Sequence, residues 1–198
     1  MNNNLIKKEK LDTYINDSYL FENIEISGYY DYLEIKNCRF KKCTFEKATF
    51  QGIDIENTKI DNTILANQAF TNHSYMNIEF NYCNLVGIDF ADSYLENITF
   101  NECNLSYANF SNTRLKNVTF KSCNLEQASL NEVKWNNLEL DNCNLKDMEI
   151  QKTPVKDLDL SNCEISNIKI DKNNLKGLIV NYNQAAIIST ILGIKIKY

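Results

Sequence analysis

A large apolar residue stands at every fifth position of this 198-residue chain from Tyr30 to Val180. The row holds 31 consecutive positions without an insertion or deletion. Two residues before each of them runs a second row of mostly small or apolar residues, and the other three positions are mostly polar. A period of five matches neither the about 3.6 residues of a helical turn nor the alternation of a strand. It matches a coil that turns one corner in each five-residue unit.

Four units make one four-sided coil, and successive coils stack as parallel strands about 4.8 Å apart. Asn often stands two residues after the large residue, as at Asn57 and Asn97, where its tolerance of turn geometry suits a corner. The sequence therefore predicts an all-β protein, a quadrilateral parallel β-helix, over residues 30–180. Its core is the large row, in which Trp135 is expected together with the phenylalanines Phe80, Phe90, Phe100, Phe110 and Phe120.

The cysteines fall in the small inward row, and five of them follow one another at 20-residue spacing: Cys83, Cys103, Cys123, Cys143 and Cys163. Neighbours in this column lie one coil apart, so their Cβ atoms stay at about 4.8 Å, beyond the usual 3.5–4.5 Å of a disulfide. A zinc site needs four ligands around one point, and a straight column offers about two. We expect small buried core residues, no metal and no cofactor.

Both ends of the chain leave the five-residue register. Residues 1–29 read as an irregular cap and a first partial coil in a shifted register, with a slip near Gly28 and a short cap or disorder over residues 1–10. Residues 181–198 predict a helix that begins at Asn181 or Asn183 and stops near Gly193, followed by a short strand at 194–197. Four residues share one face of this helix: Ile187, Ile188, Ile191 and Leu192. The open end of a coil stack needs a cap, so capping alone is one interpretation of this face, and capping with dimerisation is the other.

Charge is distributed unevenly along the chain, whose formal net charge is -5. No Lys or Arg stands between Lys59 and Arg114, and that segment carries six acidic residues: Asp61, Glu79, Asp89, Asp92, Glu96 and Glu102. We call these six the acidic belt. It is either a surface that meets a basic partner or an ordinary solvated surface. The net charge argues against direct binding of nucleic acid or anionic lipid.

The sequence lacks features typical of secreted proteins, membrane proteins and enzymes. The start of the chain has no apolar signal region and no run reaches the about 20 residues that span a bilayer, so we expect a cytoplasmic protein without a membrane segment. The single histidine, His73, and Gln68 fall in the small inward row and must be hydrogen-bonded or distort the wall. Nothing in the repeat suggests a cleft, so we expect no enzyme activity.

The repeat resembles the pentapeptide-repeat proteins, through stretches such as NLSYANF, YANFSN and CNLEQASL. The resemblance covers about residues 30–180 and implies a right-handed quadrilateral β-helix. It says little about function, because this fold serves many roles.

A narrower resemblance concerns the end of the chain. GLIVNYNQAAIISTILGIKIK at 177–197, together with NLSYANFS at 104–111, is similar to the Qnr-type quinolone-resistance proteins. This resemblance implies a homodimer formed through the C-terminal helix, and an acidic, DNA-mimicking rod that binds DNA gyrase and topoisomerase IV and relieves quinolone inhibition.

The unbroken period departs from several Qnr proteins, which interrupt the coil with two loops. The chain is therefore expected to lack these loops, and the mode of topoisomerase contact stays open. A scaffold or immunity-type interaction protein with another partner is the alternative function.

Overall fold

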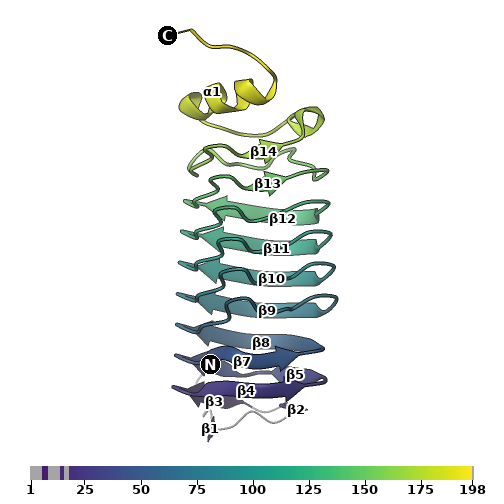
Figure 1. The fold of residues 1–198 in the computed structure, drawn as a ribbon, viewed down its shortest axis with the longest axis vertical. Coiled ribbons are helices and arrows are strands. Elements are labelled where there is room, and N and C mark those ends of the chain that lie inside the picture. Colours follow the sequence, from purple (N-terminus) through teal and green to yellow (C-terminus); the bar gives the residue numbers. More distant parts are fainter. Residues whose placement is uncertain (1–5, 9–13, 16–17, 198) are drawn as a thin grey trace.

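The computed structural model describes residues 6–8, 14–15 and 18–197, which form a parallel β-solenoid of about eight turns closed by one short helix (Figure 1). The fold predicted from the five-residue period is thus confirmed. The expectation for residues 1–10 lies outside the described residues, except for Ile6–Lys8.

The strands and helices run in chain order as β1 Ile6–Lys8, β2 Tyr14–Ile15, β3 Tyr19–Glu22, β4 Glu25–Tyr30, β5 Leu33–Lys36, β6 Arg39–Lys41, β7 Thr44–Phe50, β8 Ile53–Asp61, β9 Ser74–Asn81, β10 Tyr94–Asn101, β11 Arg114–Lys121, β12 Lys134–Asp141, β13 Glu149–Ile150, β14 Lys169–Ile170, the 3-10 helix η1 Lys172–Asn174 and α1 Tyr182–Ile191.

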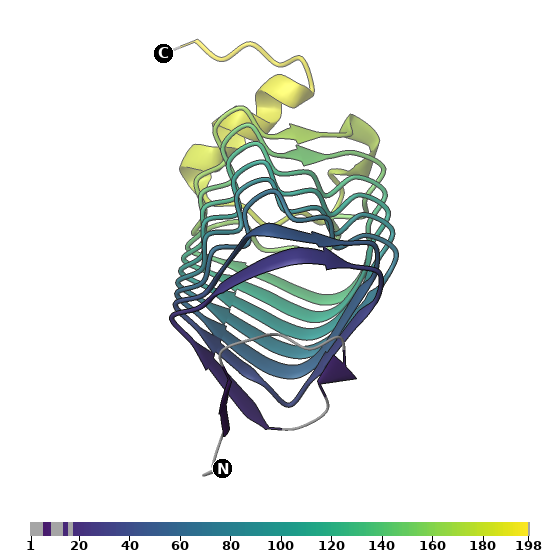
Figure 2. The same ribbon diagram turned by 60° about the horizontal axis from the view of Figure 1, so that its bottom comes forward.

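The coils stack in register, which Figure 2 shows as superimposed four-sided outlines. Strands β8 to β12 pair in parallel, and each residue faces the one 20 positions later, as Ile60 faces Phe80 and Phe80 faces Phe100. The sides without long strands are held by isolated parallel bridges such as Asn104 with Asn124. Because the register never changes between β8 and β12, this part of the rod has no inserted loop.

Corners are made by residues in the left-handed region of the backbone, two positions after the large residue. Asn97 has φ 55° and Asn117 has φ 53°, and non-Asn residues such as Tyr107 (φ 62°) take the same conformation. At one corner the asparagines also form a ladder, in which the side-chain amide of Asn117 donates to Asn97 Oδ1 at 2.9 Å and that of Asn97 to Asn77 Oδ1 at 2.8 Å. The ladder gives each of these amides a partner one coil away, which explains why Asn recurs there.

The core is a set of apolar columns that run the length of the rod. The rings of Phe80, Phe100 and Phe120 stack with centroids 4.9 and 4.8 Å apart and interplanar angles of 7° and 5°. Neighbouring columns meet edge to face, as Phe110 meets Phe120 at 5.6 Å and 85°. Phe90, Phe110 and the five cysteines of the 20-residue series are buried as well. Both ring geometries are favourable, so one column excludes water and positions the next.

Trp135 differs from the expectation that it lies in the core. Its ring is only partly buried, and Nε1 donates to the carbonyl of Pro154 at 2.6 Å. An indole N–H needs a partner, and Pro154 cannot continue the strand ladder because it has no N–H. The indole therefore turns toward the surface, where the β12 ladder ends.

The N-terminal register shifts as expected, although the slip lies slightly earlier than Gly28. Phe21 faces Phe40 and Glu25 faces Thr44, an offset of 19, whereas Ser27 faces Lys47, an offset of 20. Between these two pairs β7 has one residue more than β4, from Thr44 to Lys47, and this extra residue absorbs the difference as a bulge.

The C-terminal cap is helix α1, which has Asn181 as its N-cap residue and covers the last coil (Figure 1). Asn181 accepts from the Gln184 N–H, and Gln184 reaches back to the Asn181 N–H, so the helix starts with a capping box. The strand predicted at 194–197 is absent: after Gly193 (φ 77°) the chain turns, and the Ile194 N–H bonds back to Ser189. No described strand lies alongside this segment, so its alternation has nothing to pair with. Among the described residues, no helix is long and apolar enough to cross a membrane.

Candidate functional site

The outer surface of the rod is ordered by the same 20-residue register as the core. Lys116 binds Glu96 at 2.6 Å, and Lys146 binds Glu126 at 3.1 Å, in each case across one coil. The Lys116 ammonium and then the Tyr94 hydroxyl lower the pKa of Glu96. Whether an outward charge stays free is therefore decided by the residue one coil away.

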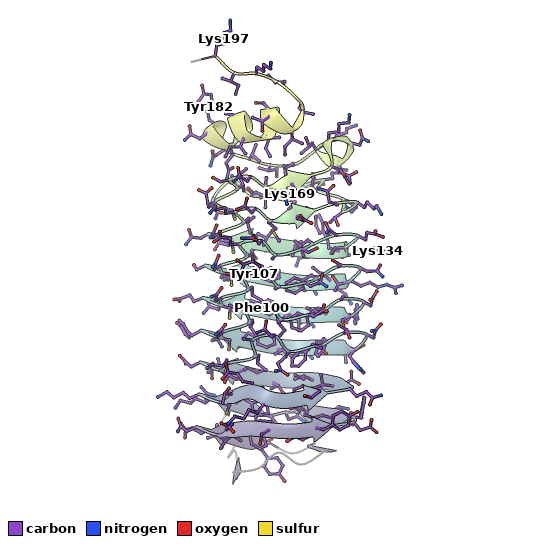
Figure 3. The ribbon with its side chains drawn as sticks, in the orientation of Figure 1. Phe100, Tyr107, Lys134, Lys169, Tyr182 and Lys197 are labelled. Atoms are coloured by element: carbon purple, nitrogen blue, oxygen red, sulfur yellow. The ribbon has the colours of Figure 1, made fainter. Side chains whose placement is uncertain are left out.

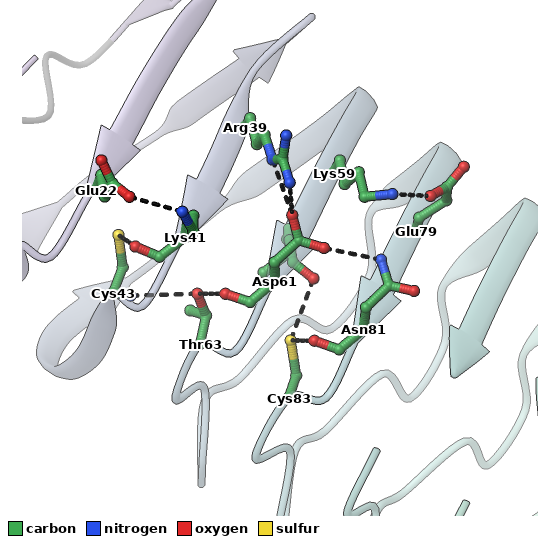
Figure 4. Close-up of polar contacts among 11 residues, drawn as sticks. Glu22, Arg39, Lys41, Cys43, Lys59, Asp61, Thr63, Glu79, Asn81 and Cys83 are labelled. Atoms are coloured by element: carbon green, nitrogen blue, oxygen red, sulfur yellow. Dashed lines mark hydrogen bonds and ion pairs between the residues drawn. The ribbon is translucent and has the colours of Figure 1, made fainter. Parts of the chain in front are cut away.

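The acidic belt is partly neutralised by this register. Asp61 is paired with Arg39 at 2.8 Å and also accepts from Asn81, and Glu79 is paired with Lys59 at 2.8 Å (Figure 4). Glu96 is paired with Lys116, as described above. Each cation comes from outside the segment that the sequence marked as free of Lys and Arg. Half of the belt is thus held in ion pairs that a reading along the chain could not see.

The other three belt residues carry no ion pair among the described residues. Asp89 accepts from the Asn109 amide at 2.9 Å, Asp92 accepts from the Asn112 amide, and Glu102 is exposed. The six members take six different positions within the 20-residue turn. The belt therefore encircles the rod and does not gather on one side.

A second acidic set, which the sequence analysis missed, does gather on one side. Around a depression of about 190 Å³ lie the four carboxylates of Glu139, Asp141, Asp157 and Asp159, which we call the acidic face. The nearest described cation is Lys156, 3.9 Å from Asp157, and both of these side chains are largely exposed. The Ser161 hydroxyl and N–H lower the pKa of Asp159, so this carboxylate stays ionised. Lysines lie between these acidic residues in the sequence, so the segment does not look acidic. Comparing outward residues at 20-residue spacing would have identified the acidic face.

The residues assigned to dimerisation divide into two groups in the structure. Ile187, Ile188 and Ile191 are partly buried and pack against the core, so they serve the cap. Leu192 is exposed, and so are three apolar residues that the sequence analysis did not single out: Tyr182, Ile194 and Ile196. Tyr182 projects from the start of α1 at the end of the rod (Figure 3). The free apolar surface of this end is therefore formed by residues at both ends of the helix.

The polar residues of the inward row are accommodated in two ways. Gln68 is buried and its amide donates to the Phe45 carbonyl at 3.1 Å. His73 is turned toward the surface, where Nδ1 lies 3.4 Å from Asp54 Oδ1 and the ring covers Gly52. A Cβ atom at position 52 would lie 3.0 Å from the imidazole and would displace it, so glycine there makes room for the ring.

The buried thiols are chemically protected. Cys103 Sγ lies 3.4 Å from the carbonyl oxygens of both Phe80 and Asn101, and this pattern repeats along the column. For Cys123 and Cys143 the neighbouring thiol one coil away raises the pKa to about 12, and burial adds to the shift. All seven cysteines are free thiols.

We therefore expect a thiol reagent such as dithionitrobenzoate to leave the folded protein unmodified at pH 8 and to modify all seven cysteines in guanidinium chloride. The thiolate is the reactive form; burial keeps the reagent away from the seven side chains, and the raised pKa of Cys123 and Cys143 keeps these two thiols protonated at this pH. Absorbance at fixed reagent concentration measures both reactions. A cysteine that reacts in the folded protein as fast as free cysteine contradicts the expectation.

Comparison with known proteins relates the repeat to a known family. A model of the pentapeptide repeat region matches residues 73–150 and 114–186, which together span more than half of the chain. No curated protein matches the sequence.

Among solved structures, a trypsin-treated variant of QnrB1, a plasmid-mediated fluoroquinolone resistance protein, is 21% identical, with TM-score 0.57 over 97% of this chain and 96% of that chain. Full-length QnrB1 is 20% identical, with TM-score 0.57 over 95% and 100%. HetL, a pentapeptide repeat protein involved in heterocyst differentiation regulation from the cyanobacterium Nostoc sp. strain PCC 7120, is 14% identical, with TM-score 0.47 over 86% and 92%. The structural likeness to QnrB1 concerns the fold, and the match of the family model identifies the family: this chain belongs to the pentapeptide-repeat proteins.

Proposed function

We propose that the protein binds a type II topoisomerase, DNA gyrase or topoisomerase IV, as a DNA mimic and thereby contributes to quinolone resistance. The observation that carries the proposal is the likeness to QnrB1 along 97% of this chain and 96% of that chain, which includes the cap as well as the coils. A DNA mimic acts by binding and not by chemistry, so the proposal includes no catalytic residue. It places the protein in the cytoplasm, where topoisomerases act.

The acidic face is the surface that we assign to the partner. A DNA-binding groove is basic, and it is attracted most strongly by carboxylates that no cation of the same chain neutralises. Glu139 and Asp159 are exposed and stand in the same outward column, one coil apart. Because the coils between β8 and β12 carry no inserted loop, the partner would contact the wall of the rod itself.

The proposal also includes a two-fold homodimer through the exposed apolar end. Tyr182, Leu192, Ile194 and Ile196 would be covered by the same residues of a second copy. Replacing Ile187 and Ile191 by Asp would unseat the cap as well as any dimer, so Leu192→Asp with Ile194→Asp is the cleaner variant. Light scattering that finds the wild-type protein monomeric removes the dimer from the proposal.

A supercoiling assay with gyrase and ciprofloxacin tests the function. We expect added protein to restore supercoiling, and Glu139→Gln with Asp159→Asn to weaken this protection by about tenfold in the concentration required, because two uncompensated charges are lost. The matched control is Glu126→Gln with Glu132→Gln, which changes the net charge equally but removes acids already paired with Lys146 and Lys152. Protection that is absent at every protein concentration, with supercoiling also uninhibited, contradicts the proposal.

A second candidate function is an interaction protein with a different partner, such as a scaffold or an immunity factor. The observation that favours it is the pairing of Asp61, Glu79 and Glu96 with basic residues, which makes half of the acidic belt unlike a row of phosphates. A pulldown that recovers another protein and no topoisomerase would support this candidate.

A further inference from the structure

A groove of about 380 Å³ crosses four successive coils on the side of the rod that includes the start of β9 to β12. Its floor contains Ser93 and Thr113, which are buried and whose hydroxyls donate to the carbonyls of Phe70 at 2.9 Å and Phe110 at 2.7 Å. Small residues of the inward row thus leave a hollow between two rows of larger outward side chains. With coils about 4.8 Å apart, the groove is about 14 Å long, the span of about four extended residues.

One wall of the groove carries two cations in an unfavourable arrangement. Arg114 and Lys134 are directly paired residues of β11 and β12, so their side chains leave the sheet about 4.8 Å apart. Both are exposed, and Lys134 projects from the edge of the rod (Figure 3). Like charges directly opposite each other on neighbouring strands destabilise a sheet.

Other lysines of this region are held in ion pairs, whereas, among the described residues, Arg114 and Lys134 are not. In the same region Lys116 and Lys152 each bind a glutamate one coil earlier, at 2.6 and 2.8 Å. The residues that flank Arg114 and Lys134 in their own column are Tyr94 and Pro154, which offer no carboxylate. Within the described part of the chain, neither cation has an acidic side chain at ion-pair distance. A bound carboxylate would therefore supply the missing counter-charge.

The opposite wall selects among anionic ligands. It carries the carboxylates of Asp92 and Glu132, the first bonded to the Asn112 amide and the second to the Lys152 ammonium. Asp92, which has no ion pair among the described residues, repels a ligand that is anionic along both edges, such as a nucleic-acid backbone. An extended peptide presents N–H donors and separate side chains, so it can place an acidic side chain on one wall and donors on the other.

We propose that this groove binds a short acidic peptide segment of a partner protein, one carboxylate of which bridges Arg114 and Lys134. The two cations, one coil apart, match the separate oxygens of one carboxylate, and Arg114 offers the planar donor pair that carboxylates favour. The inference goes beyond the topoisomerase proposal and does not rest on it, because the acidic face has the opposite charge.

Fluorescence anisotropy with a labelled Gly/Ser peptide of about six residues that carries two glutamates tests the proposal. We expect Arg114→Gln with Lys134→Gln to weaken binding by about tenfold, the combined effect of two partly exposed charges. The matched control, Lys42→Gln with Lys121→Gln, removes two exposed cations elsewhere on the rod and should change binding less than about twofold. A peptide with glutamines in place of the glutamates should not bind at the same concentrations.

A third variant separates binding from folding. Lys134→Glu places a carboxylate beside Arg114, as Glu79 stands beside Lys59, so the chain fills its own site. We expect this variant to lose peptide binding while its urea midpoint stays at or above that of the wild type. The proposal is overturned if both double variants lose binding equally, if the glutamine peptide binds as well as the glutamate peptide, or if labelled single-stranded DNA of equal charge binds more tightly.

Discussion

Replacing Phe100 with alanine is expected to lower the free energy of unfolding by about 3–5 kcal/mol, the usual cost of deleting a buried phenyl ring. The ring is fully buried and stacks on Phe80 and Phe120 at 4.9 and 4.8 Å, and it also meets Phe90 and Phe110 edge to face. A coil stack cannot collapse around the void, because hydrogen bonds on both sides fix the spacing of the coils. The loss should therefore lie at the upper end of this range.

Urea unfolding followed by circular dichroism measures this effect, with Tyr107→Ala as the control. Tyr107 lies at the second corner after Phe100, is 58% exposed and has φ 62°, so the control removes an aromatic ring from a corner without opening the core. We expect the control to change the free energy of unfolding by less than about 0.5 kcal/mol. Equal losses in the two variants would show that the aromatic columns do not carry the stability of the rod.

Replacing Gln184 with alanine is expected to release the C-terminal cap at a cost of about 2 kcal/mol. The buried side-chain amide donates to the carbonyls of Leu160 at 2.8 Å and Cys163 at 2.7 Å, and its oxygen completes the capping box with Asn181. Alanine withdraws the donor from two carbonyls at the end of the core and removes one half of the cap. The helix then loses its main polar attachment to the last coil.

Hydrogen exchange of the α1 amides measures the release of the cap. We expect faster exchange in α1 while the amides of β9 to β12 keep their protection, because contacts in a solenoid are local. Asn183→Ala is the control, since Asn183 is the exposed residue next to Gln184. Unchanged exchange in the Gln184 variant would mean that Ile187, Ile188 and Ile191 hold the cap without the amide.

Much of the fold follows from the sequence, because the five-residue period determines both which residues are buried and which residues form the corners of the coil. The five-residue row predicted which residues are buried, as Phe80 to Phe120 show, and the 20-residue column of cysteines predicted the pitch. The register slip before residue 30 was also predicted from local signals, and the cap at Asn181 is one of the two that were predicted, the other being Asn183. These features depend on sterics and hydrogen bonds within a few residues or one coil.

The surface is where the sequence-based prediction was least accurate. Asp61 and Glu79 looked like free charges, since no cation follows them in the chain for many residues, but Arg39 and Lys59 lie beside them. The acidic face was hidden for the same reason, because Glu139 and Asp159 are interleaved with lysines such as Lys146 and Lys152, which pair with Glu126 and Glu132 elsewhere on the rod. Trp135, expected in the core, is only partly buried and donates its N–H to the Pro154 carbonyl.

The sequence by itself determined the solenoid, its pitch and its core, because a side chain's direction in a coil depends only on its position within the five-residue unit. Only the tertiary structure decided which charges are neutralised, which are free and where a groove opens. Those properties depend on the residue one coil away, and a coil brings together side chains that lie 20 positions apart along the chain. The unpaired Arg114 and Lys134 show this, since neither position appears unusual until the other stands beside it.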